Sequence, residues 1–319
     1  MKKLTCVALA ALGVAIAAGS ASAEELWDPH LRGVDEGLAA GALPPPGVYG
    51  ILDNYWAGYS QYNSSGHKTG AHLDALIEIP IVLWNPGIKV LGADYAMAIA
   101  QAGDYTNFKS ANNAGLSNNA HWGTFNTILV PGILSWSLPN DLHVKTGLTI
   151  YMDDASSSPN SPPNGGGVGA GNGYWSVEPD FGISWLHDGW NVSADMQYVY
   201  NFADSSYQVK NPNTNIVGGY SYTSGQEITG DYTVTKTIGK WTFGVGGFSL
   251  NQINNDSGQG ADYAGCGKSN GCKAQSYGAG PILGYQFGGI SIVGEYSHNI
   301  YTENDVAGEM LNVRLVAPF

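Results

Sequence analysis

The strongest pattern in the chain is a strict alternation of apolar and polar residues. In residues 175–202, apolar side chains occupy every odd position from Trp175 to Trp185. After an "HDG" turn they occupy every even position from Trp190 to Phe202. Alternation with a period of two predicts β-strands, because successive side chains of a strand point to opposite faces. This stretch is therefore expected to form a hairpin of two long strands, each with one apolar and one polar face.

The same alternation recurs along the rest of the chain and predicts twelve strands in total. The last of them, residues 308–319, runs to the end of the sequence and places five apolar residues on one face: Leu311, Val313, Leu315, Ala317 and Phe319. The remaining predicted strands lie at or near residues 47–61, 73–84, 87–101, 120–137, 142–152, 219–236, 239–253, 277–287 and 290–300.

The lengths of the strands and of their connections decide between a soluble sandwich and a membrane barrel. Strands of soluble proteins usually have about 5–6 residues, whereas a tilted membrane-spanning strand needs about 9–11. Short turns such as "LPND", "HDG" and "FGG" alternate with longer connections, and the longest lie near residues 102–119, 153–172, 203–218 and 254–273. We therefore predict an all-β fold, a transmembrane up-and-down antiparallel β-barrel of twelve strands with short periplasmic turns and long extracellular loops.

Four prolines lie inside predicted strands: Pro80, Pro131, Pro179 and Pro281. Proline has no backbone N–H, and a closed barrel has no free edge to accommodate it. Bulges or local breaks in the hydrogen-bonding ladder are expected at these positions. Pro179 and Pro281 fall on the apolar, lipid-facing side of their strands.

The front of the chain divides into three parts. Residues 1–23 have the features of a signal peptide: Lys2 and Lys3, an apolar core, and an "ASA" cleavage site. Residues 24–46 follow and end in three consecutive prolines, and residues 47–319 form the predicted outer-membrane barrel. The segment 24–46 has two open placements, in the periplasm or folded back into the lumen as a plug.

Composition and charge restrict the functional classes. Only 12% of the residues are charged, against about 25% in a typical soluble domain. No later stretch approaches the ~18 continuous apolar residues of a transmembrane helix. Removal of the signal takes away two lysines and no acid, so the net charge falls from −13 to −15. An exported, acidic chain is a poor match for nucleic acid.

Two cysteines remain after the signal is removed, Cys266 and Cys272, separated by a flexible "GKSNG" spacer. Export permits a disulfide, and this spacing allows a small closed loop. A metal pair is the alternative, but no further cysteine or nearby histidine completes such a site. We expect a disulfide, and we expect no metal, nucleotide or redox cofactor.

Several motifs carry a resemblance to a known family. They are "EGLAAGALPPPGVYGILDNYWAGY", "GAGPILGYQF" and "GEYSHNIYTENDVAGEMLNVRLV". With these motifs the mature chain resembles the outer-membrane proteins of the meta-pathway of phenol degradation. The resemblance implies a β-barrel in the outer membrane of a Gram-negative bacterium and a role in the uptake of aromatic or other hydrophobic compounds. It supplies no catalytic motif.

The polar face of each strand is expected to face the lumen. This assignment gives the lumen-lining candidates, which are Asp74, Glu78, Trp84, His143, Lys145, Tyr151, Glu178, Asp180, Asp195, Glu295 and Arg314. Among them acids outnumber bases. A solvated barrel interior with paired charges explains such a set, and so does a lumen that disfavours anions while neutral phenolic compounds pass.

Three functional classes follow. We favour a channel for passive uptake of small hydrophobic or aromatic compounds over a structural or binding barrel with a closed lumen. An outer-membrane hydrolase is less well supported, because Ser297 and His298 are adjacent on a strand and so point to opposite faces. Phe319, an aromatic residue at the end of the last strand, is expected to act as a signal for the barrel-assembly machinery. The outer wall of the barrel is expected to contact the lipid of the outer membrane.

Overall fold

The computed structural model describes residues 27–109, 119–155, 171–211, 213–214, 216–267 and 272–319. The predicted signal peptide, residues 1–23, lies outside these ranges. Among the described residues, twelve strands form one closed antiparallel barrel. The barrel strands are β1 (Gly47–Tyr62), β2 (Lys68–Asn85), β4 (Ala93–Lys109), β5 (Asn119–Leu138), β6 (Leu142–Tyr151), β7 (Ser176–His187), β8 (Trp190–Asn201), β11 (Glu227–Ile238), β12 (Trp241–Gln252), β13 (Gln275–Phe287), β14 (Ile290–Glu303) and β15 (Val306–Pro318).

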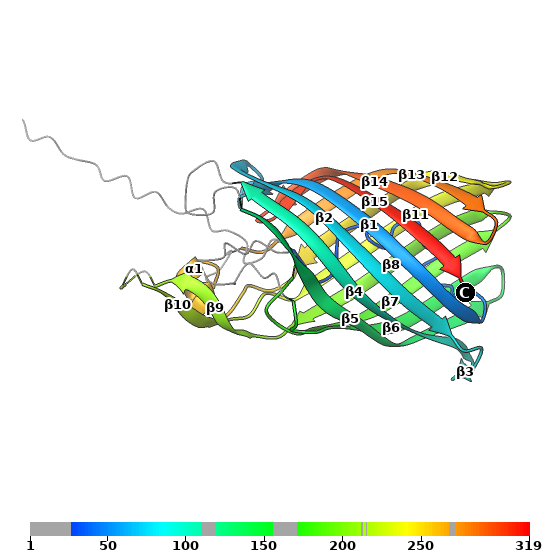
Figure 1. The fold of residues 1–319 in the computed structure, drawn as a ribbon, viewed down its shortest axis with the longest axis horizontal. Helices are drawn as coiled ribbons and strands as arrows, with labels where there is room; N and C mark the ends of the chain where they lie inside the picture. The colour runs from blue at the N-terminus through cyan, green and yellow to red at the C-terminus, as the bar shows by residue number, and fades with distance from the viewer. Residues whose placement is uncertain (1–26, 110–118, 156–170, 212, 215, 268–271) are drawn as a thin grey trace, which may run out of the picture.

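The barrel closes because its first and last strands pair with each other. β1 lies antiparallel to β15, with Asp53 opposite Arg314. β2 pairs with β1 on one side and with β4 on the other. The short turns gather at one end of the barrel, beside the C-terminus, and the longer connections gather at the other end (Figure 1). The predicted twelve-stranded up-and-down barrel is confirmed.

The long connections also contain structure that the alternation did not reveal. The predicted strand 219–236 is divided: β10 (Val217–Tyr222) leaves the barrel and pairs with β9 (Asp204–Lys210), and only β11 belongs to the barrel wall. A short helix, α1 (Gln259–Ala264), lies beside this hairpin (Figure 1). Together they form a small extracellular unit whose apolar centre is Tyr222, Ala261 and the cysteine pair.

Two of the connections at the end of the barrel opposite the C-terminus are short. Residues 63–67 join β1 to β2, and only residues 304–305 join β14 to β15. A two-residue strand, β3 (Lys89–Val90), pairs with the beginning of β4 and occupies the first part of the strand predicted near 87–101. As a result β4 starts at Ala93, six residues later than the predicted strand near 87–101, and continues to Lys109.

All four strand prolines coincide with interruptions of a ladder. Pairing between β2 and β4 omits Pro80, and pairing between β13 and β14 omits Pro281. The β7–β8 ladder omits Pro179, and a register shift between β5 and β6 spans Pro131. The missing N–H is therefore accommodated by local breaks, as predicted from the sequence.

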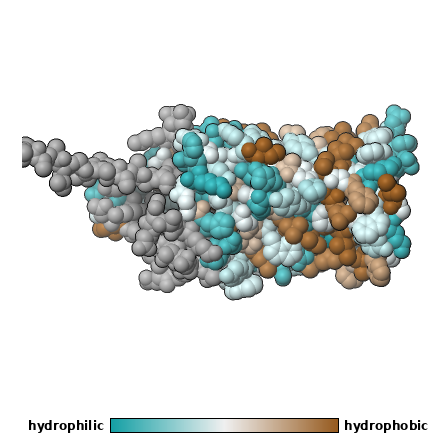
Figure 2. All heavy atoms as spheres, turned by 90° about the horizontal axis from the view of Figure 1, so that it is seen from above, coloured by the Kyte–Doolittle hydropathy of each residue, from teal (hydrophilic) through white to brown (hydrophobic). Residues whose placement is uncertain are grey.

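The outer wall carries the apolar stripes predicted from the alternation. Trp185, Trp190 and Trp241 are exposed near the short turns, and Trp175 and Phe202 are exposed toward the other end. Figure 2 shows apolar residues gathered between a polar rim at the short-turn end and a more polar half toward the long connections. Exposed aromatic residues at both ends of an apolar band are typical of a barrel embedded in lipid. No helix in the described part of the chain is long and apolar enough to cross a membrane.

The segment before β1 lies inside the barrel. Trp27, Leu31 and Ala40 are buried, and the segment packs against the inner faces of β1, β2 and β15. Of the two placements open from the sequence, residues 27–46 thus occupy the lumen rather than the periplasm. We call residues 27–46 the plug.

Candidate functional site in the barrel lumen

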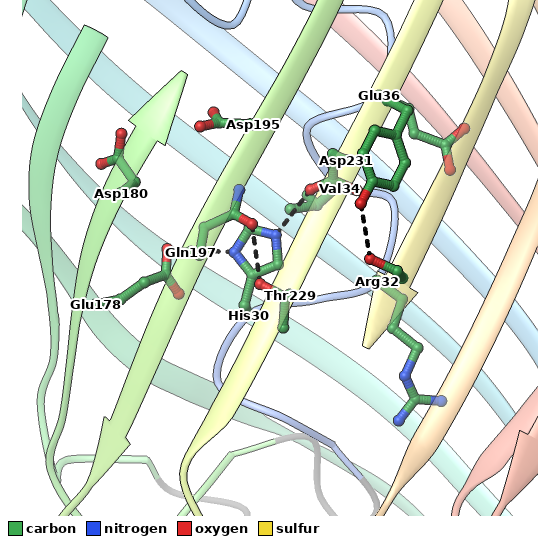
Figure 3. A network of polar contacts seen from close by, with 12 residues as sticks. His30, Arg32, Val34, Glu36, Glu178, Asp180, Asp195, Gln197, Thr229 and Asp231 are labelled. Atoms are coloured by element: carbon green, nitrogen blue, oxygen red, sulfur yellow. Dashed lines mark hydrogen bonds and ion pairs between the residues drawn. The ribbon is translucent and has the colours of Figure 1, made fainter. Parts of the chain in front are cut away.

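His30 attaches the plug to two strands of the barrel. Its Nε2 lies 2.9 Å from Asp231 Oδ2 in β11, and its Nδ1 lies 3.3 Å from Glu178 Oε1 in β7 (Figure 3). Burial alone would lower the pKa of His30, but Glu178 and Asp231 outweigh burial and raise the pKa well above its ordinary value. A protonated His30 donates a hydrogen bond from each ring nitrogen to one of these carboxylates.

Arg32 attaches the plug at a second place, the turn between β14 and β15. Its Nη2 lies 2.6 Å from Asp305 Oδ1 in the β14–β15 turn and 2.6 Å from Asp28 Oδ2. Its guanidinium also donates to the Val306 carbonyl, and Tyr55 donates to the carbonyl of Arg32 at 3.0 Å. These contacts are buried, so water competes weakly for the charged groups.

Glu36 and Arg314 fix the middle of the plug. Ser297 of β14 donates to the Glu36 carboxyl at 2.9 Å, and Arg314 of β15 donates to the carbonyls of Val34 and Glu36. Arg314 also pairs with Asp53 of β1 at 2.8 Å. Burial in the first place, and then neighbouring carboxylates, raise the pKa of Glu36 to about 9. A neutral Glu36 removes the cost of a second buried negative charge beside Asp231.

The plug approaches the barrel backbone closely where glycines allow it. Gly41 N donates to Ser184 Oγ at 2.7 Å, and Ser135 Oγ donates to the Gly41 carbonyl at 2.8 Å. A Cβ atom on Gly182 of β7 would lie only 2.2 Å from the Ala40 carbonyl oxygen. The plug therefore fits this wall only because Gly182 has no side chain.

A cavity of about 570 Å³ remains between the plug and the barrel wall. One side of the cavity is apolar and is formed by residues of β1, β2, β4 and β5, namely Ile51, Ile79, Ile81, Leu83, Ala98, Ala100, Ala102, Phe125, Ile128, Val130 and Ile133. Leu31, Val34 and Leu38 of the plug also line it. An apolar wall of this kind favours uncharged or amphipathic solutes over ions.

The facing side of the cavity is polar. Lys145 of β6 lies 2.7 Å from Asp195 Oδ2 in β8 and 3.2 Å from Asp180 Oδ1 in β7. Gln197 of β8 accepts a hydrogen bond from Thr229 at 2.9 Å, and Tyr151 of β6 donates to Glu178 at 2.9 Å. The cavity is thus divided between an apolar half and a hydrogen-bonding, charged half.

Eight of the eleven residues that the sequence assigns to the lumen lie on its inner face. They are His143, Lys145, Tyr151, Glu178, Asp180, Asp195, Glu295 and Arg314. His143 pairs in register with the inward Ser184 near the short turns, and Glu295 lies beside Arg314 at 3.7 Å. The other six line the cavity described above.

Three predicted lumen residues lie elsewhere. Asp74, Glu78 and Trp84 are on the outer face of β2, because the alternate residues Ile79, Ile81 and Leu83 line the cavity. Trp84 is 46% exposed, and Asp74 faces a groove on the outer wall with Trp56 and Leu311. The expectation was wrong because the plug supplies apolar partners inside the barrel: Trp27, Leu31 and Val34 pack against the aliphatic row of β2.

The plug contributes the functional residues that the sequence did not identify. His30, Arg32, Asp35 and Glu36 all occur in a short segment without alternation, so a strand pattern cannot assign them to a face. One signal was present: four ionisable residues and several apolar residues lie within the same stretch, "HLRGVDEGL", before the prolines.

The remaining sequence candidates have simple positions. Cys266 and Cys272 form a disulfide in the extracellular unit. Phe319 is 87% exposed, and its backbone N–H donates to the Val48 carbonyl at 2.9 Å. Ser297 is buried on the inner face, while His298 is exposed on the outer face and lies 2.6 Å from Glu309. Ser297 and His298 therefore do not form a catalytic pair.

A closed twelve-stranded barrel with an apolar outer band, an acidic lumen and an internal plug defines the class of outer-membrane β-barrels. Residues 58–315 match the family described as "Putative MetA-pathway of phenol degradation". The chain belongs to this family.

Solved structures show the same fold at low sequence identity. An outer-membrane channel from Pseudomonas putida F1 has a TM-score of 0.70 and 12% identity, covering 90% of this chain and all of that one. The transport unit of the autotransporter AIDA-I from Escherichia coli has a TM-score of 0.50 and 9% identity, covering 86% and 90% of the two chains. No curated protein matches the sequence.

Proposed function

We propose that the protein is an outer-membrane channel for the passive uptake of small hydrophobic or aromatic compounds. The observation that carries this proposal is the apolar half of the lumen cavity, from Ile79 and Ile81 of β2 to Phe125 and Ile128 of β5. A purely polar lumen would serve water-soluble ions and sugars, whereas an aliphatic and aromatic wall stabilises an apolar solute by removing it from water.

A solute that crosses the barrel has to pass the plug. The plug lies inside the lumen and is attached by His30 to β11 and by Arg32 to the β14–β15 turn. We propose that a solute entering from outside moves along the apolar side of the cavity while the plug stays attached or shifts locally. The predicted signal peptide and the C-terminal aromatic residue support export and insertion through the barrel-assembly machinery.

A second candidate function is a structural or binding barrel with a closed lumen. The dense set of contacts between the plug and the wall, including Glu36 with Ser297 and Gly41 with Ser184, favours it. In that case the extracellular unit formed by β9, β10 and α1 would carry the function.

Solute uptake into liposomes separates the two candidates. Full-length protein and protein lacking residues 24–46 are reconstituted, and entry of a neutral aromatic solute is followed. Uptake by the full-length protein supports the channel. Absence of uptake by both forms overturns the channel and favours the closed barrel, while uptake only after the deletion assigns the plug as a complete block.

A further inference from the structure

The lumen cavity carries an excess of negative charge. Its lining includes two cationic side chains, Lys145 and Arg314, and a third in His30 when that residue is protonated. Five carboxylates line the same cavity: Asp35, Asp53, Glu178, Asp180 and Asp195. Arg314 pairs with Asp53, His30 with Glu178, and Lys145 is shared by Asp180 and Asp195. The pairing leaves Asp35 and one carboxylate of the Lys145 group without a full counter-charge.

Asp35 is the central unpaired group. In the described part of the chain its carboxylate makes no hydrogen bond and no ion pair of normal geometry, although one oxygen lies within 4.8 Å of ligand atoms of His30 and Asp231. Asp35 is also close enough to Asp195 and Lys145 to act on both electrostatically. Lys145 and Arg314 also act on Asp35 electrostatically, but neither makes an ion pair with it, so its carboxylate oxygens keep room for hydrogen bonds from a further cation.

Independent evidence for a ligand comes from a buried polar atom that lacks a partner. Asp195 is 2% exposed, and its Oδ1 accepts no hydrogen bond within the described residues. The Asp195 side chain lines the cavity, and Figure 3 shows it two positions before Gln197 on the same strand. A buried group of this kind is normally satisfied, so it marks the place of a missing partner.

We propose that this cavity binds a small organic cation with an apolar body, a primary arylalkylamine being the simplest example. The ammonium group lies between Asp35 and Asp195, to which it donates hydrogen bonds, and the apolar body lies against Ile81, Ala100 and Phe125 across the cavity. This inference rests on the proposed function in that it uses the same cavity, and it specifies the class of solute retained there.

The apolar half of the cavity argues for an organic cation over a metal ion. Ca²⁺ takes six to eight oxygen ligands, and Mg²⁺ keeps several waters, so neither gains from the aliphatic wall formed by β2 and β4. An organic anion would meet an excess of carboxylates. A neutral aromatic compound fits the apolar half but leaves the Asp35 charge uncompensated.

Three probes of matching shape test the proposal: 2-phenylethylamine, 2-phenylethanol and phenylacetate. Their affinities for the purified full-length protein in detergent are measured by calorimetry. We expect the amine to bind about tenfold more tightly than the alcohol, as for one added charge-assisted hydrogen bond, and the carboxylate to bind most weakly. Asp35→Asn is expected to reduce amine affinity about tenfold and to leave alcohol affinity unchanged.

Asp188→Asn provides a matched control, because it removes the same charge from a turn where the Asp188 side chain is 84% exposed. This variant should bind the amine as the wild type does. Retained binding of the alcohol shows that Asp35→Asn is folded. Equal affinities for amine and alcohol, an unaffected Asp35→Asn variant, or Ca²⁺ binding that depends on Asp35 without amine binding would each overturn the proposal.

The liposome measurement distinguishes this proposal from the function on which it rests. Uptake of a neutral aromatic solute without any preference for the amine leaves the channel in place and removes the cation site. Amine binding without uptake of any solute keeps the cation site and removes the channel.

Discussion

His30 of the plug donates a hydrogen bond to Asp231 of β11, at a distance of 2.9 Å and across 201 positions of the sequence. The same imidazole reaches Glu178 of β7 at 3.3 Å. One side chain thus joins the plug to two strands separated in the barrel by β8. The state of the lumen depends on contacts of this kind, which are buried and charged.

Replacement of His30 by alanine is expected to loosen the plug. It leaves Glu178 and Asp231 buried without their cationic partner, and loss of one partner of a buried ion pair costs about 3–5 kcal/mol. We expect higher conductance in planar bilayers than for the wild type. His72→Ala is the control, because His72 makes a similar 2.9 Å contact with Asp74 in which both side chains are 44% exposed. Equal conductance of the His30→Ala variant and the wild type would show that His30 does not hold the plug.

A methyl group on Gly182 should displace the plug sterically. Its Cβ would lie 2.2 Å from the Ala40 carbonyl oxygen, and overpacking of this kind costs about 1–3 kcal/mol. Amide hydrogen exchange in residues 36–46 should become faster in Gly182→Ala. Gly58→Ala, where a Cβ meets no atom within 4 Å, should leave the exchange unchanged. If both variants match the wild type, the close approach of Ala40 and Gly182 has no energetic role.

The attachment of the plug should weaken as the pH rises. The pKa of His30 is raised above its ordinary 6.5, so its contribution is complete below pH 6.5 and is lost as the pH passes the folded-state value. Glu36 also weakens the attachment as the pH rises. Its pKa is raised from 4.5 to about 9 in the folded protein, so between these two values the attached plug must keep a proton that the detached segment loses. Asp35, Glu178, Asp231 and Glu295 are the other ionisable groups facing this pair.

A spin label on Leu38→Cys, 36% exposed in the plug, measures this effect. Its mobility should increase between pH 6 and pH 10, while a label on Ile238→Cys at the short-turn end should not change. A plug label that becomes less mobile at high pH would reverse the predicted sign.

Deletion of Phe319 should reduce outer-membrane assembly more than synthesis. The residue is 87% exposed at the end of β15, so its removal costs the barrel little packing. Phe319→Trp, which retains a terminal aromatic residue, should assemble normally. Comparison of total and membrane-inserted protein checks the prediction, and normal insertion of the deletion variant would count against a role in assembly.

The barrel could be predicted from the sequence because lipid imposes a strict rule on the outer wall. In the hairpin of β7 and β8 every outward residue from Trp175 to Trp185 and from Trp190 to Phe202 is apolar, proline included, so the number and direction of the strands follow from the alternation. The ladder breaks at Pro179 and Pro281 were predictable for the same reason, since a missing N–H has a fixed consequence.

The inner wall follows no such rule. A lumen filled with water requires polar residues, but a lumen filled with a peptide accepts apolar ones. In β2 the face with Asp74 also carries Leu76, Val82 and Trp84, which suit lipid, and the aliphatic face meets Leu31 of the plug. Which face points inward therefore depends on a segment whose position the sequence left open. The contacts of His30 and Arg32, each with strands far along the chain, could not be predicted from local pattern.

The most direct test of the channel is the uptake of a neutral aromatic solute into liposomes by a variant with a filled cavity. Ala100 of β4 is 5% exposed and lines the apolar half, whereas Val82 of the neighbouring strand β2 is 50% exposed on the outer face and does not line the cavity. We predict that Ala100→Trp lowers the uptake rate severalfold, while Val82→Trp leaves it at the wild-type rate. Equal uptake by the wild type and both variants would contradict passage of the solute through this cavity.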